Sequence, residues 1–206
     1  MLFDVFEARK RGFNATQEFL KERITRKFNW KPKHSVEYFE SPYSSSLTDS
    51  IQDLRRAIAA TVVPGEIVLT TPRQAIYFEE VGVKQLAVYD ISQAQLLESN
   101  RIEKVYWCDV FNMSLLKSLL ILAQPTLIYL SNILERTWGQ DMKSVEDVAD
   151  RLSNFSYLKN IMFSGIMDNS LVSREFLSML QSRGWSSQEF MHSADERTPR
   201  VFSARR

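Results

Sequence analysis

Residues 67–90 carry the strongest fold signal of the sequence, because their pattern predicts a strand, a helix, a turn and a second strand in succession. It opens with a short apolar and β-branched run, which is typical of a strand buried on both faces. Pro72 suits the first turn of a helix, and Gly82 suits the position just after its end. Residues 86–89 are a second apolar run, and Asp90 follows it. The stretch therefore predicts a βαβ unit with two parallel strands.

Asp90 stands at the carboxyl end of the second predicted strand. In open α/β sheets, ligands bind beyond the carboxyl ends of the strands. An acid about 20 residues after the first strand is a usual partner of a nucleotide ribose. Asp90 is therefore a candidate binding residue, and the alternative is a surface acid that caps a helix.

The rest of the chain continues the alternation of strands and helices. We predict an α/β fold with a doubly wound, mostly parallel seven-stranded sheet, a C-terminal antiparallel strand pair and additional N-terminal helices. The predicted helices cover residues 47–63, 72–81, 92–99, 114–122, 144–152 and 170–183. The predicted strands cover residues 67–70, 86–89, 104–108, 126–130 and 161–163, and the closing pair covers residues 187–192 and 200–204.

Two parts are expected in the chain: an N-terminal helical and loop cap at residues 1–46, and the α/β domain at residues 47–206. Residues 29–46 carry four aromatic side chains between prolines and serines, so they predict an ordered loop that covers a site. The alternative is a loop that its aromatic side chains fix to the surface. The basic residues of the first helices indicate either a solvated face or a surface for an acidic substrate.

Composition excludes several classes of protein. The formal net charge of +1 gives no strong signal for nucleic acid. The single cysteine, Cys108, excludes a disulfide framework and a cysteine-based metal site, so no metal site is expected. No apolar run approaches the roughly 20 residues of a membrane span, and no signal peptide is recognised. We expect a cytoplasmic protein that does not enter a membrane.

The order of elements resembles the class I S-adenosylmethionine-dependent methyltransferase superfamily, whose reversed last strand is inserted into the sheet. The resemblance covers about residues 47–206. It is carried by the acid after the second strand, the CDVFN segment after the third, and the LSNILE segment after the fourth. Such enzymes use S-adenosylmethionine as the cofactor. The resemblance implies these cofactor-binding residues: Thr70, Thr71, Asp90, Ile91, Asp109, Val110 and Asn132.

One departure from the family concerns the loop after the first strand, which is usually rich in glycine. Here it reads Thr-Thr-Pro-Arg-Gln, and all six glycines lie elsewhere. Glycine lets a backbone approach a cofactor closely. The hydroxyls of Thr70 and Thr71 could hold the methionine carboxylate instead, or the side chains of Thr71 and Pro72 could fill the site.

Two functions of different classes remain open. The first is an S-adenosylmethionine-dependent transferase, with methyl transfer preferred over aminocarboxypropyl transfer, an unidentified acceptor and no assigned catalytic residue. The second is an inactive relative that serves as a structural module or binds a protein partner. An enzyme predicts an open space between the candidate residues, and an inactive relative predicts that side chains fill it, with Tyr77, Gln95 or Phe111 as candidates. A nicotinamide-dependent oxidoreductase is disfavoured, because a pyrophosphate needs the glycine loop more than a sulfonium amino acid does.

Overall fold

The fold is taken from a computed structural model, which describes residues 51–90, 96, 102, 104–131, 133–134, 142–165, 170–190 and 200–206. The expected N-terminal cap and its aromatic loop lie outside these residues, as does nearly all of the helix expected at residues 92–99.

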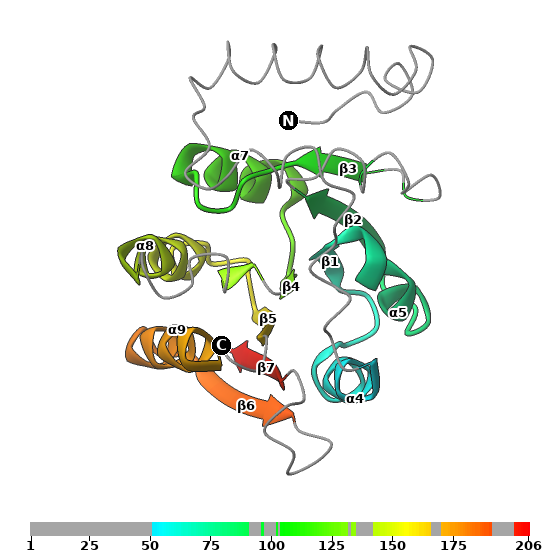
Figure 1. The fold of residues 1–206 in the computed structure, drawn as a ribbon. Coiled ribbons are helices and arrows are strands. Elements are labelled where there is room, and N and C mark those ends of the chain that lie inside the picture. The colour runs from blue at the N-terminus through cyan, green and yellow to red at the C-terminus, as the bar shows by residue number, and fades with distance from the viewer. Residues whose placement is uncertain are drawn as a thin grey trace.

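One seven-stranded sheet organises the described residues, with the order β3-β2-β1-β4-β5-β7-β6 (Figure 1). The strands are β1 (Ile67–Thr70), β2 (Gln85–Asp90), β3 (Lys104–Trp107), β4 (Leu127–Ser131), β5 (Asn160–Gly165), β6 (Ser186–Phe190) and β7 (Arg200–Arg205). The helices are α4 (Ile51–Thr61), α5 (Ala75–Glu79), α7 (Met113–Ala123), α8 (Met142–Ser153) and α9 (Ser170–Ser182), and a 3-10 turn, η2 (Pro72–Gln74), precedes α5.

The first five strands and β6 run in the same direction, and β7 runs against them, which confirms the predicted reversal of the last strand. β7 pairs antiparallel with β5 on one side and with β6 on the other, so it is inserted between them. Phe202 is in register with Phe163 of β5 and with Glu189 of β6. The predicted mostly parallel sheet with a C-terminal antiparallel pair is therefore correct.

Helices cover both faces of the sheet, and each face has its own apolar core. α4 and α5 lie on one face, and α7, α8 and α9 lie on the other (Figure 1). The larger core, on the α7–α9 side, contains Phe163, Phe176 and Phe202. The smaller core joins α4 and α5 to β1, β4, β5, β6 and β7. All five residues of β4 are buried, as a central parallel strand requires.

Local chemistry explains where α7 begins and ends. The side chain of Asn112 accepts hydrogen bonds from the backbone N–H groups of Ser114 and Leu115, both at 3.2 Å, so Asn112 caps the helix. Gln124 ends the helix in the left-handed conformation, with φ of 45°. α5 is shorter than its sequence predicted, because the residues that follow Pro72 form a 3-10 turn first.

Replacing Phe163 by Ala tests the larger core. The Phe163 ring lies 5.0 Å from that of Phe176 and 5.1 Å from that of Phe202. The cavity left behind should lower the free energy of unfolding by about 3–5 kcal/mol. Urea denaturation measures this. Ile121→Ala is the control, because Ile121 is 50% exposed and its loss should cost less than about 1 kcal/mol. Equal losses in the two variants would contradict the described packing.

Candidate functional site

The carboxyl ends of the parallel strands bring the predicted site residues to one edge of the sheet. Thr70 ends β1, Asp90 ends β2, and Ser131 ends β4, while Asp109 lies two residues after β3. The order of strands reverses between β1 and β4, since β2 follows on one side and β5 on the other. This reversal is the switch point at which open α/β sheets bind ligands.

The loop after β1 runs without the backbone conformations that need glycine. Thr71 is extended, with φ of −80° and ψ of 156°, and Gln74 has φ of −83°. A left-handed conformation is absent from this loop, so the missing glycines cost the backbone nothing here. The consequence of their absence lies in the side chains that the loop carries.

Gln74 is the side chain that connects the two sides of the switch point. Its carboxamide oxygen accepts a hydrogen bond from the Thr71 hydroxyl. Its carboxamide nitrogen donates to the Ser131 hydroxyl at 3.1 Å, so it joins the loop after β1 to the end of β4. The Gln74 side chain is buried, with 2% of the residue exposed. Sequence reasoning named Tyr77, Gln95 and Phe111 as candidates to fill the site and missed Gln74.

None of the three named candidates is placed at the switch point by a described contact. Tyr77 packs against the α4 side, where the guanidinium of Arg55 lies 5.5 Å from its ring centroid. Phe111 is part of the core on the other face. Gln95 lies outside the described residues.

Asp90 is held at the end of β2 in a buried position, with 6% of the residue exposed. It is in register with Trp107 of β3, and its carbonyl accepts a hydrogen bond from the Cys108 N–H at 3.1 Å. Trp107 itself is part of the apolar core. The structure thus places the acid where a ribose-binding carboxylate is expected.

Asp109 organises the turn between β3 and α7. One oxygen of its carboxylate accepts a hydrogen bond from the Phe111 N–H at 3.0 Å. Its carbonyl accepts from the Asn112 N–H, also at 3.0 Å. The helix cap is Asn112 rather than Asp109, so the carboxylate braces the turn without capping α7. Val110 is buried beside it.

Thr70 and Thr71 are both buried next to the switch point. The Thr70 hydroxyl has no hydrogen-bond partner in the described part of the chain. An unsatisfied buried hydroxyl destabilises the folded protein by about 1–3 kcal/mol. A polar group of a ligand that hydrogen-bonds to Thr70 would remove this cost. The two remaining predicted residues, Ile91 and Asn132, lie outside the described residues.

Cys108 directly precedes Asp109 and is buried. Burial raises the pKa of its thiol well above the ordinary value, and the neighbouring Asp109 carboxylate raises it further. Because the thiolate is the reactive form, Cys108 is unsuited to act as a nucleophile.

We expect Cys108 to resist iodoacetamide at pH 8 in the folded protein and to react fully in denaturing urea. Mass spectrometry measures the labelled fraction. Because the pKa of the thiol is raised in the folded state, the contribution of Cys108 to the free energy of unfolding is fully present below the ordinary thiol pKa of about 8.5. We expect this contribution to decline as pH rises above that value. Rapid labelling of the folded protein at pH 8 would contradict the described burial.

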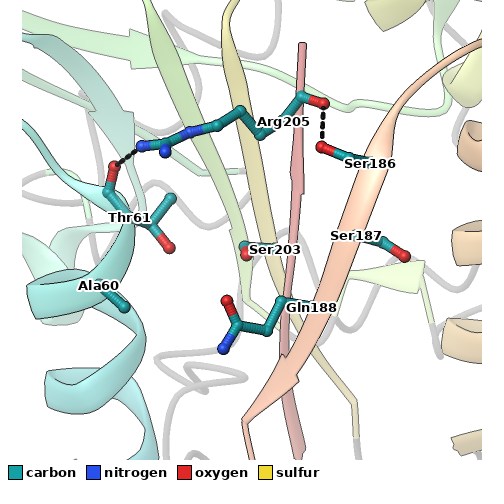
Figure 2. A pocket seen from close by; sticks show the side chains of 7 residues that line it. All are labelled: Ala60, Thr61, Ser186, Ser187, Gln188, Ser203 and Arg205. Atoms are coloured by element: carbon teal, nitrogen blue, oxygen red, sulfur yellow. Dashed lines mark hydrogen bonds between the residues drawn. The ribbon is translucent and has the colours of Figure 1, made fainter.

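A small polar cavity of about 230 Å³ lies away from the carboxyl ends of the parallel strands (Figure 2). It is lined by the end of α4, the start of β6 and the end of β7, including Thr61, Gln188 and Ser203. The Arg205 guanidinium closes one side through hydrogen bonds to the Thr61 carbonyl at 3.0 Å and to the Asn160 side chain at 3.1 Å. Because Asn160 is the first residue of β5, this cavity is separate from the candidate site at the carboxyl edge.

The described ranges contain no group of three or more His, Cys, Asp or Glu side chains placed to bind a metal. None of their helices has the length and apolarity that crossing a membrane requires.

The fold is shared with methyltransferases of known structure. The methyltransferase domain of bacterial CtHen1 matches with 10% identity and a TM-score of 0.53, over 75% of this chain and 98% of that one. The Mtq2–Trm112 complex of E. cuniculi matches with 14% identity and a TM-score of 0.49, over 81% of this chain and 98% of that one. No protein-family model matches the sequence, and no curated protein matches it.

The chain therefore has the fold of class I S-adenosylmethionine-dependent methyltransferases, as its sequence predicted. The residues at the carboxyl edge fit this cofactor unequally. The carboxylate of Asp90 at the end of β2 would suit its ribose, because a carboxylate accepts hydrogen bonds from two hydroxyls. At its amino-acid end the polar groups of Thr71 and Ser131 already bind Gln74.

Proposed function

We propose that the chain binds S-adenosylmethionine at the carboxyl edge of the sheet and transfers its methyl group to an acceptor that is not yet identified. The observation that carries this proposal is the pair of buried acids, Asp90 and Asp109, at the ends of adjacent strands in a fold that methyltransferases use. Asp90 would accept hydrogen bonds from the ribose hydroxyls. Asp109 and Val110 would lie beside the adenine.

The remaining proposed contacts come from the loop after β1 and from segments that follow β2 and β4. The buried Thr70 hydroxyl could donate a hydrogen bond to the methionine carboxylate of the cofactor, and Thr71 lies next to Thr70. Ile91 and Asn132 complete the proposed set. S-adenosylmethionine supplies an activated methyl group when it is bound.

The contribution of the protein would be to bind, orient and exclude water. Transfer between two held groups gains most of its rate from proximity and alignment, so it does not require a dedicated general base. Aminocarboxypropyl transfer would use the same cofactor and stays a variant of the proposal. We further propose that residues 1–46 form a cap over the domain at residues 47–206, and that the protein acts in the cytoplasm.

The second candidate function is a non-catalytic module that binds a protein partner. The contact that favours it is the hydrogen bond from Gln74 to Ser131, because it joins the two sides of the switch point without any ligand. The two candidates differ in whether a nucleoside binds at Asp90.

Calorimetric titration with adenosine and with S-adenosylmethionine separates them. We expect both ligands to bind the wild-type protein, and Asp90→Asn to weaken both at least tenfold, which is about 1.4 kcal/mol. The amide keeps the size of the side chain and removes the charge that strengthens its hydrogen bonds. Asp147→Asn is the matched control, because Asp147 is a surface acid on α8 that pairs with Lys143.

Binding that survives Asp90→Asn unchanged would contradict the proposed role of that acid. The absence of heat from either ligand at millimolar concentration would contradict the transferase and favour the non-catalytic module.

A further inference from the structure

The switch point of this sheet holds a side chain of the chain itself. Gln74 sits between Thr71 and Ser131, and all three residues are buried. The Gln74 carboxamide accepts from one hydroxyl and donates to the other. The contact spans 57 residues of sequence, so it is a tertiary interaction and not a turn.

The chemistry of this carboxamide matches the amino-acid end of the proposed cofactor. That end carries a carboxylate, which accepts hydrogen bonds, and an ammonium group, which donates them. The carboxamide of Gln74 offers one acceptor and two donors on a single planar group. It therefore satisfies the Thr71 and Ser131 hydroxyls in the way that a bound amino-acid group would.

We propose that Gln74 is an intramolecular competitor for the amino-acid end of the ligand. This inference rests on the proposed function, since it takes the ribose end to bind at Asp90. S-adenosylmethionine and S-adenosylhomocysteine must displace the Gln74 side chain before they can bind fully. Adenosine lacks the amino-acid end and binds without displacing it.

Because the site is buried, this competition should have a measurable effect on ligand affinity. In water, a displaced carboxamide would exchange its hydrogen bonds with solvent at little net cost. At a buried site, the displaced groups must find new partners in the ligand, so any imperfect replacement lowers affinity. The wild-type protein should therefore discriminate against ligands that carry the amino-acid end.

The test compares adenosine with S-adenosylhomocysteine by calorimetry on four proteins. Gln74→Ala removes the competitor and opens its space. Gln74→Met keeps a side chain of similar volume there and removes the hydrogen bonds. Gln188→Ala is the matched control, because Gln188 is an exposed glutamine at the opposite edge of the sheet. Circular dichroism and thermal unfolding verify that each variant is folded.

We expect Gln74→Ala to raise the affinity for S-adenosylhomocysteine at least tenfold and to leave the affinity for adenosine within twofold of wild type. Gln74→Met should gain less than Gln74→Ala, because its side chain still fills the space, and Gln188→Ala should change neither affinity. If Gln74→Ala fails to fold, Gln74→Ser provides the same small side chain with a hydroxyl that can bond to a neighbour.

An unchanged or lowered affinity for S-adenosylhomocysteine in the folded small-side-chain variant would overturn the competition. If adenosine still binds in an Asp90-dependent manner in that case, the proposed function stands without the competitor. If no protein binds either ligand, the competition and the proposed function both fail.

Discussion

The pairing of β1 with β4 determines how the other strands are arranged in the sheet. The two strands are far apart in sequence, yet the Ile67 N–H donates to the Thr126 hydroxyl at 3.0 Å and the Thr126 N–H donates to the Ile67 carbonyl at 2.8 Å. This pairing sends β2 and β3 to one side and β5 to the other. The reversal opens a switch point between the carboxyl ends of β1 and β4, and every candidate site residue that the structure describes lies along that edge.

Much of the fold could be predicted because its signals are local. Short apolar runs between turn residues place the strands, and the polar segment before the last strand indicates a hairpin rather than another crossover. The ends of elements were less predictable. α5 begins one 3-10 turn late because Pro72 shapes the loop, and α7 begins one residue earlier than predicted because Asn112 caps it. Such details depend on which side-chain oxygen reaches which N–H group, and several residues compete for that role.

The residues of the candidate site also differ in how well the sequence predicts them. Asp90 and Asp109 were found from their positions after predicted strands, because a strand end is a local feature. Gln74 was missed, because its role depends on Ser131, which lies 57 residues away in sequence. The loss of the glycine loop was visible in the sequence, but its physical meaning was not. The backbone follows an ordinary path, and the change appears as a buried carboxamide that joins the two sides of the switch point.

We propose that this protein binds a nucleoside at the carboxyl edge of the sheet and not in the polar cavity beside α4. Amide hydrogen exchange with and without adenosine distinguishes the two places. We expect slower exchange in peptides that cover residues 86–90 and 107–112, with no change at residues 186–190 and 200–206. Slower exchange confined to the strands that line the α4 cavity, or no change anywhere, would contradict it.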